Sequence, residues 1–399
     1  MTLAPFRFLS VHRACRPVGD IAEVVATPNS ILRLPAEPPI DFRPPDIFDP
    51  ADAGEAQRLA SPERNRDQFG VGFDSSQDHF VARLDDVTIQ RWTMLGAECF
   101  RIFLDRGVAL SEPYNAHYKA DWTALRRYDA IRVDVDGTYV PVYLHDEVEP
   151  DVTVEEPAFY MLDKGAKNYY HWMCEVMPRI WAREAAPGLA ALPMLVNDAT
   201  LMAFQHQTLT TLNPAHVIPF PWRCARFKRL YLSSFLSSGE VARRLRPWFA
   251  SLRSRFGGAV DTNGPRRLFL SRSDATRRRV TNDAEIADAL GRLGFARVTL
   301  DGRSVAAQLD LFAGAEAIVL PHGAAGGSLP AAAPGTLVVE CHASPLLNPT
   351  YWLVARAMEQ RYGLVTSGTP IEGDPDYLAD MTIDRQKLMG VVEAGLSAR

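Results

Sequence analysis

A histidine, a glutamate and an arginine recur at four-residue intervals in one short segment: His171, Glu175 and Arg179. On a helix this spacing places the three side chains on one face. A base, an acid and a cation on one face could carry out acid–base chemistry. The alternative is an exposed helix face with ordinary i, i+4 pairs, and the segment alone does not separate the two.

The residues around this segment predict how it is positioned. It follows an apolar run at 158–162 and a polar link at 163–167, which indicates a strand, a turn and a helix that begins near Asn168. The helix has a second, apolar face, formed by Trp172, Met173, Val176, Met177 and Ile180. The titratable face would therefore lie at the carboxyl end of a strand.

A glycine-rich stretch follows a later predicted strand, with the sequence Pro-His-Gly-Ala-Ala-Gly-Gly-Ser at 321–328. Glycine allows a ligand to approach the backbone closely, and a helix amino terminus offers N–H groups to an anion. These features suit the diphosphate of a nucleotide. A plain tight turn is the alternative, and the dinucleotide fingerprint G-x-G-x-x-G is absent.

Four arginines lie within eight residues at the end of another predicted strand: Arg272, Arg277, Arg278 and Arg279. Guanidinium groups bind phosphate bidentately. A solvated basic loop is the alternative. Because open α/β sheets bind ligands at the carboxyl ends of their strands, the arginines and the glycine-rich turn together favour a nucleotide site.

Two further groups could take part in ligand or metal binding. Asp134 and Asp136 form a D-x-D that could hold a divalent metal, but Asp136 runs into Gly137, which favours a hairpin turn. Glu340 and His342 end another predicted strand and could touch a ligand, although a histidine in a loop is more often structural.

Composition narrows the class of protein. The chain has 399 residues, of which 47% are hydrophobic and 23% charged, as in ordinary globular proteins. A formal net charge of -5 argues against a nucleic-acid partner. The five cysteines are far apart and form no C-x-x-C pair, so neither a disulfide framework nor a zinc site is expected.

The amino terminus is too poor in apolar residues for a signal peptide, and no window reaches the roughly 18–20 apolar residues of a spanning helix. We therefore expect a cytoplasmic protein. Contact with the inner membrane face or with a polysaccharide-assembly complex stays open.

The pattern of predicted elements indicates an α/β fold with two main domains. We expect an extended proline-rich arm at 1–65, a β-meander with an α/β domain at 66–256, a second α/β domain at 257–370, and a tail helix at 371–399 that packs back. The glycine-rich stretch 257–265 is the expected linker. Asn282 and Glu285 predict a capping box for a helix of the second domain.

Four segments, taken in order, resemble glycosyltransferase family 61. They are 168–179 (Asn-Tyr-Tyr-His-Trp-x-x-Glu-x-x-Pro-Arg), 270–275 (Leu-Ser-Arg-Ser-Asp-Ala), 278–282 (Arg-Arg-x-x-Asn) and 321–324 (Pro-His-Gly-Ala), which Pro-Gly-Thr follows at 334–336. That family includes bacterial capsular polysaccharide proteins and eukaryotic β-xylosyl- and N-acetylglucosaminyltransferases. The resemblance covers about residues 75–365.

The resemblance implies a GT-B-like fold, with two Rossmann-like domains facing a cleft and an N-terminal β-rich extension. It also implies an inverting glycosyltransferase that moves a hexosyl or pentosyl group from a nucleotide sugar, taken as UDP-linked, to a glycan or other hydroxyl acceptor in surface or capsular polysaccharide synthesis. No metal or other cofactor is required. The turn here continues as Ala-Gly-Gly-Ser at 325–328, whereas relatives often have Gly-Leu and an asparagine, which affects the expected donor preference.

Carried over by position, the resemblance gives roles to individual residues. Glu175 is the expected base, and His171 orients it, shares the proton or is itself the base. Asn168, Tyr170 and Arg179 belong to the acceptor side, the first two as framework and Arg179 as an ion-pair partner. The residues expected to bind the donor nucleotide and diphosphate are Ser271, Arg272, Arg278, Arg279, His322, Gly323, Ala324 and Glu340.

Two other readings remain at this point. A nucleotide-sugar epimerase would convert the donor without an acceptor. A non-catalytic binding or scaffold subunit of a polysaccharide-assembly complex would be unaffected by changing Arg278. The donor sugar, the acceptor and the oligomeric state do not follow from the sequence.

Overall fold

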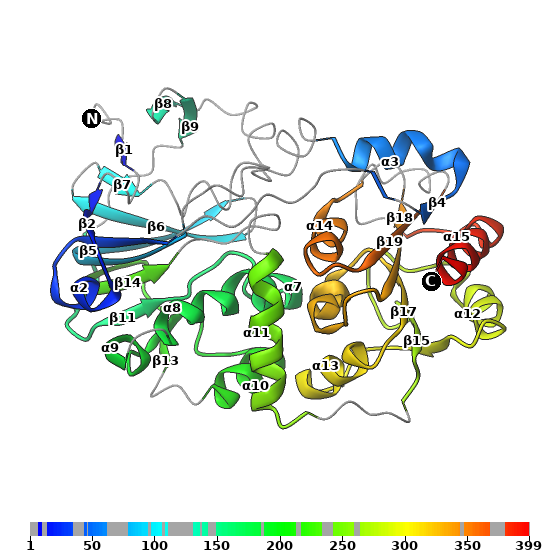
Figure 1. Ribbon diagram of the computed structural model, residues 1–399. Coiled ribbons are helices and arrows are strands. Elements are labelled where there is room, and N and C mark those ends of the chain that lie inside the picture. Colours follow the sequence, from blue (N-terminus) through cyan, green and yellow to red (C-terminus); the bar gives the residue numbers. More distant parts are fainter. Residues whose placement is uncertain are drawn as a thin grey trace. The chain divides into compact units, whose positions relative to one another are not determined.

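The computed structural model describes most of the chain and divides it into two compact units (Figure 1). Unit 1 comprises residues 1–38 and 67–237, and unit 2 comprises 39–66 and 238–399. The described residues are 7–9, 14–34, 44–45, 47–61, 79–94, 97–105, 108–110, 131–135, 138–142, 149–184, 187–212, 217–233, 242–258, 264–343, 347–367 and 380–398.

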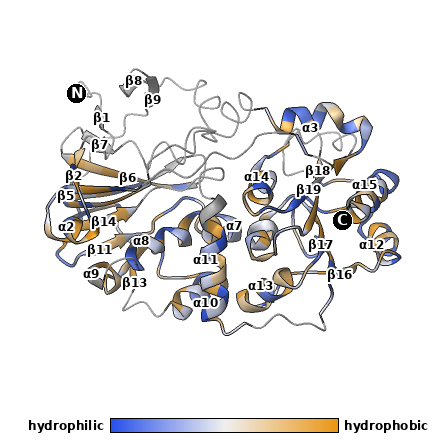
Figure 2. Ribbon diagram, in the orientation of Figure 1, coloured by the Kyte–Doolittle hydropathy of each residue, from blue (hydrophilic) through white to orange (hydrophobic). Residues whose placement is uncertain are grey.

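Unit 1 is built on one mixed sheet. Along its main path the strands are β1 (Arg7–Leu9), β7 (Val108–Leu110), β6 (Ala97–Asp105), β5 (His79–Met94), β14 (Cys224–Ser233), β11 (Ala158–Tyr160), β12 (Met194–Val196) and β13 (Val217–Pro219). Strands β2 (Arg16–Val18), β3 (Ser30–Leu34) and β10 (Val152–Val154) pair beside this path. Hydrophobic residues dominate its central strands (Figure 2).

The predicted meander and the predicted parallel strands belong to the same sheet. Strand β14 pairs antiparallel with β5 from Cys224 opposite Gln90 to Ser233 opposite Val81. On its other edge β14 pairs parallel with β11 and β10. One apolar core therefore serves both parts, and it contains Leu84, Phe227 and Leu230.

The hairpin expected at Asp134–Gly137 is present in the backbone. Strands β8 (Ile131–Val135) and β9 (Thr138–Val142) pair antiparallel, with Val135 opposite Thr138. The strands on either side of the D-x-D segment thus pair as expected for a hairpin. Asp136 and Gly137 themselves lie outside the described residues.

Unit 2 contains a parallel sheet with the strand order β16-β15-β17-β18-β19-β4. Its strands are β15 (Arg267–Leu270), β16 (Ala296–Val298), β17 (Ala317–Pro321), β18 (Leu337–Ala343), β19 (Arg361–Ser367) and β4 (Ile47–Phe48). Figure 1 shows helices α13 (Val305–Ala313) and α14 (Thr350–Ala357) on one side of this sheet, and α12 (Asp283–Gly291) and α15 (Arg385–Ser397) on the other. Both units are thus α/β, as predicted.

The described part of residues 1–65 is folded rather than an extended arm. Strand β3 pairs with β5 in unit 1, whereas β4 adds to β19 in unit 2 and is followed by η1 (Pro50–Asp52) and α3 (Ala53–Leu59). Buried Asp52 accepts hydrogen bonds from the backbone N–H and hydroxyl of Thr366, at 3.0 and 2.6 Å, and from Lys387. These contacts hold the segment around Asp52 in unit 2, although its local sequence does not predict that it belongs to a domain.

The boundary between the units lies at 237/238, not at the linker expected at 257–265. The reason is helix α11 (Ala242–Arg255), which packs against α13 and α14 and so belongs to unit 2. The tail helix α15 packs against β18 and β19.

All five cysteines are buried. None of the helices in the described ranges has the length and apolarity needed to cross a membrane.

Candidate functional site

The helix that carries His171 and Glu175 is irregular. It consists of α7 (Tyr169–His171), a π turn (Trp172–Val176), a 3₁₀ turn (Met177–Arg179) and α8 (Ile180–Glu184). Asn168 is its N-cap and accepts hydrogen bonds from the backbone N–H groups of Tyr170 and His171. The five predicted apolar-face residues are all fully buried. π turns are frequent at functional sites.

His171 and Glu175 form a close pair. Nδ1 of His171 lies 2.6 Å from Oε2 of Glu175. The ring is packed on Gly165, where an added Cβ would come within 2.6 Å of it. The His171 side chain is 42% exposed and that of Glu175 11%, so both can reach a ligand.

The pair makes His171 a cation at neutral pH. Burial by itself lowers the pKa of His171, but the charge of Glu175 and the hydrogen bond to it outweigh burial and raise that pKa to about 9. Asp163 also raises it and Lys164 lowers it. The imidazolium donates from Nδ1 to Glu175, and its Nε2–H has no hydrogen-bond partner among the described residues.

Arg179 does not share a face with His171 and Glu175, contrary to the helical spacing. Its side chain is 1% exposed, pairs with Asp163 at 2.5 Å and donates to the backbone oxygen of Leu162. The π turn shifts the register of the residues that follow it, which directs Arg179 into the core. Arg179 is therefore an ion-pair partner beneath the site. Tyr170 is also buried, with its ring edge-on to His171.

Replacing Arg179 by alanine is expected to lower the free energy of unfolding by about 3–5 kcal/mol, because it leaves the Asp163 carboxylate buried without its counter-ion. Denaturant unfolding measures the loss. A matched control is Arg226→Ala, which removes an exposed ion pair with Asp86 and should cost only about 0–1 kcal/mol. Equal losses for the two variants would contradict the role given to the buried pair.

In unit 2, the strand order places the predicted phosphate-binding residues together. Numbered by sequence within this parallel sheet, the strands β15 to β19 follow the doubly wound order 2-1-3-4-5, which has its switch point between β15 and β17. The loop after β15 carries Arg272 and the turn after β17 carries His322 and Gly323. Ligands bind at such a point in open α/β sheets.

Arg272 and Gly323 touch directly. A Cβ on Gly323 would lie 2.0 Å from Nη1 of Arg272, so only glycine lets the guanidinium rest there. The guanidinium is oriented by two hydrogen bonds of 2.9 Å, from Nε to the backbone oxygen of Arg278 and from Nη2 to that of Arg277. Burial and then the charge of Arg278 lower the pKa of Arg272. Two cations are thus held close together, an arrangement that an anion would stabilise.

Arg278 is half-buried and has a φ of 54°, in the left-handed region that residues with a side chain seldom adopt. Such strain is often stored at functional sites. Arg277 is exposed. The backbone of the loop 271–279 is therefore shaped around Arg272 and Arg278.

Two other residues that were predicted to bind the donor nucleotide, Arg279 and Ser271, instead form hydrogen bonds within unit 2. Arg279 is exposed and binds Asp380 through its backbone N–H, Nε and Nη2 at 2.7–2.9 Å. The hydroxyl of buried Ser271 lies 2.8 Å from Oδ1 of Asp283 at the start of α12. These residues fix the loop that presents Arg272 and Arg278.

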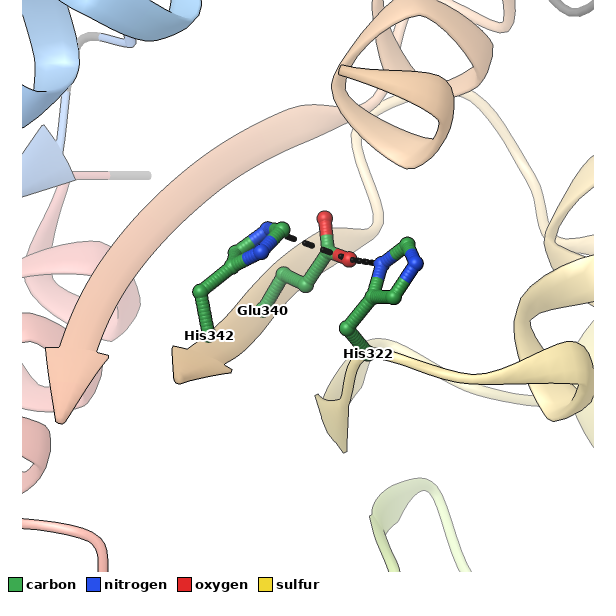
Figure 3. Close-up of side chains that lie close together, drawn as sticks. All are labelled: His322, Glu340 and His342. Atoms are coloured by element: carbon green, nitrogen blue, oxygen red, sulfur yellow. Dashed lines mark hydrogen bonds and ion pairs between the residues drawn. The ribbon is translucent and has the colours of Figure 1, made fainter. Parts of the chain in front are cut away.

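Behind the glycine-rich turn lies a buried cluster of polar side chains (Figure 3). Oε1 of Glu340 is 2.6 Å from Nδ1 of His322 and 3.2 Å from Nε2 of His342. Oε2 of Glu340 accepts a hydrogen bond of 2.5 Å from the hydroxyl of Tyr362. Glu340 and His342 come from β18, and His322 follows β17, as the sequence indicated.

The cluster has an ionised carboxylate and a neutral His322. Burial alone would raise the pKa of Glu340, but the two histidines hold it well below its usual range. Burial, together with the charges of His342 and Arg278, lowers the pKa of His322 despite the opposing effect of Glu340. His171 and His322 thus each pair with a glutamate at 2.6 Å, yet their pKa values shift in opposite directions.

His322, Glu340 and His342 also supply the donor types that a metal could use, since their ligand atoms lie within 4.8 Å of one another. Figure 3 shows that one oxygen of Glu340 contacts both imidazoles, through a hydrogen bond to His322 and an ion-pair contact with His342.

The residues that follow His322 form η5 (Ala324–Ala331), the helix expected after the turn, although it is 3₁₀. It rests on Tyr351, whose hydroxyl donates to the backbone oxygen of Gly323 at 2.5 Å. The Tyr351 ring would collide with a Cβ on Gly326. Tyr351 and Tyr362 carry no signal in the sequence, because each acts through a contact with a distant segment. Gly165 was also not predicted, since its role depends on how the His171 ring packs on it.

The comparisons with known proteins agree with the motifs. Residues 169–339 match the family model described as Glycosyltransferase 61. The matched stretch includes the His171–Glu175 pair, the arginine loop and the His322 turn. A search of curated proteins finds no match. Residues 169–339 of this chain are thus similar to glycosyltransferase family 61.

Proposed function

We propose that the protein is an inverting glycosyltransferase that transfers a sugar from a nucleotide sugar, UDP-linked in our preferred reading, to a glycan or other hydroxyl acceptor. The observation that carries this proposal is the pair of cations at the switch point of unit 2, Arg272 and Arg278, with the guanidinium of Arg272 resting on Gly323. The match of residues 169–339 to the family model supports the transferase activity. A role in surface or capsular polysaccharide synthesis is part of the proposal.

In this proposal the donor diphosphate binds Arg272, Arg278 and the backbone of Gly323 and Ala324. Guanidinium groups stabilise the negative charge that develops as the nucleotide diphosphate leaves, a task that a metal ion would otherwise perform. Ser271, Arg279 and Glu340 support these contacts through the loop and the buried cluster. A GT-B arrangement, with the acceptor on the unit 1 side, belongs to the same proposal.

Glu175 takes the proton of the acceptor hydroxyl. His171 is protonated at neutral pH and donates from Nδ1 to the carboxylate, while its Nε2–H can donate to a substrate oxygen. The reaction forms the bond from the acceptor oxygen to the anomeric carbon and breaks the bond from that carbon to the diphosphate. The proton passes to Glu175.

The pH profile separates the two members of the pair. At saturating donor, the rate should be steady near neutrality and fall as the pH rises through about 9, where His171 loses its proton. A rate that instead rises through about 9 would assign the base to His171.

The contribution of the His171–Glu175 pair to the free energy of unfolding depends on pH in the same direction. It is complete below pH 6.5 and is lost as the pH rises through about 9. The free energies of unfolding of wild type and His171→Gln should therefore converge over that range.

A donor screen tests the function itself. Purified protein is incubated with a panel of nucleotide sugars, with and without a chelator and with and without candidate hydroxyl acceptors. We expect one donor to be hydrolysed slowly, faster turnover with an acceptor, and no effect of the chelator. Conversion of the sugar with the nucleotide still attached would indicate an epimerase, and no turnover or nucleotide binding would indicate a scaffold subunit.

A further inference from the structure

On the proposed donor side, Nε2 of His322 is a hydrogen-bond acceptor, and so are the phosphate oxygens of the proposed ligand. Nδ1 of His322 lies against Glu340, and an ionised carboxylate can only accept hydrogen bonds, so the ring hydrogen is on Nδ1. A neutral imidazole then has a bare lone pair at Nε2. Figure 3 shows this nitrogen on the side of the ring away from Glu340, and no described residue forms a hydrogen bond with it.

The surroundings of His322 explain why the ring is neutral before a ligand binds. Arg278 lies near enough for its charge to oppose protonation, and His342 stacks on the ring at 5.1 Å with a similar effect. The Tyr351 ring is 5.3 Å away. Glu340 acts in the opposite direction, but its charge is shared with Tyr362 and His342.

A diphosphate would reverse this balance. Its negative charge would offset the positive charge of Arg278, which adds to burial in keeping the ring neutral. A phosphate oxygen would also meet a lone pair at Nε2 unless that nitrogen carried a hydrogen. Glu340 is already in place to hold the resulting imidazolium, at 2.6 Å from Nδ1.

We propose that binding of a nucleoside diphosphate in unit 2 takes up one proton from solvent at Nε2 of His322, which converts this nitrogen from a hydrogen-bond acceptor into a donor to a phosphate oxygen. The hydrogen on Nδ1 stays with Glu340, so no other group changes protonation. Glu340, held by Tyr362, acts as a positioning residue. This inference rests on the donor site of the proposed function.

Calorimetric titration with UDP tests the proposal on the intact protein. Titrations between pH 7.5 and 9, where the phosphates of UDP are fully ionised, are run in two buffers of different ionisation enthalpy. We expect the uptake of close to one proton per UDP at pH 7.5. Wherever the uptake is close to one proton, affinity should weaken about tenfold for each pH unit.

Two variants make the assignment specific. His322→Gln keeps an amide that can donate to a phosphate but cannot titrate, so proton uptake should disappear and UDP affinity should lose its pH dependence. His206→Gln changes an exposed histidine in unit 1 and should leave both unchanged.

The outcomes are distinct. UDP binding without proton uptake, or uptake that persists in His322→Gln, overturns the proposal and leaves the donor site intact. If wild type binds neither UDP nor GDP, the donor site and this inference both fail. If His322→Gln does not fold, the two-buffer titration of wild type decides by itself.

Discussion

Glu175→Gln is expected to lower the rate of sugar transfer by about 10²–10⁴-fold, the contribution of a positioned base. Glutamine has nearly the same shape, but it cannot accept a proton at neutral pH. It also removes the negative charge that holds His171 protonated at 2.6 Å, so the neighbouring imidazole should titrate at a lower pH. The rate is measured at saturating donor with the nucleotide sugar that the donor screen identifies.

Glu175→Gln should lower the transfer rate without changing the affinity for the nucleotide. Glu175 belongs to unit 1 and the arginine loop to unit 2, so UDP affinity should be unchanged in Glu175→Gln. Glu155→Gln, which alters an exposed carboxylate of unit 1, is the matched control and should transfer sugar at the wild-type rate. Full turnover by Glu175→Gln would remove Glu175 as the base.

Gly323→Ala is expected to weaken UDP binding by about 10–100-fold, because hydrogen bonds to charged groups contribute about 1.5–3 kcal/mol. The new methyl group would lie 2.0 Å from Nη1 of Arg272, which is too close for both to stay in place. The guanidinium would therefore have to leave its two backbone acceptors. Gly291→Ala is the control, since a Cβ there meets no atom within 4 Å, and it should bind UDP normally.

A double-mutant cycle identifies the cause. In an Arg272→Ala background the space beside Gly323 is empty, so adding Gly323→Ala should weaken UDP binding little further. Additive losses from the two substitutions would mean that the glycine serves a ligand or a backbone conformation and not the placement of Arg272. Thermal unfolding of each variant checks that unit 2 remains folded.

The sequence alone was sufficient for those parts of the fold that depend on local pattern. The alternation of apolar runs and amphipathic segments predicted the parallel strands of unit 2, from β15 to β19, and the apolar face of the His171 helix. Residue types at strand ends singled out Arg272 and His322 as well, because the carboxyl ends of parallel strands meet at one edge. These are consequences of periodicity and chain direction, which a sequence states directly.

Tertiary structure decided what depends on distant partners. The pairing of β14 with β5, the addition of β4 to β19 and the bond from Arg279 to Asp380 join segments far apart in sequence. Asn282 is the N-cap residue of α12, but the expected capping box does not form, because its side chain binds the backbone of Ile383.

The π turn is the clearest case. A regular helix would have kept Arg179 beside His171 and Glu175, whereas the observed turn buries it against Asp163. The pKa values likewise followed from surroundings. Burial lowers the pKa of both histidines, but Glu175 outweighs burial at His171, whereas the charges of His342 and Arg278 add to burial at His322. The sequence determined which residues could do chemistry, and the packing around them decided which carry charge and which support the fold.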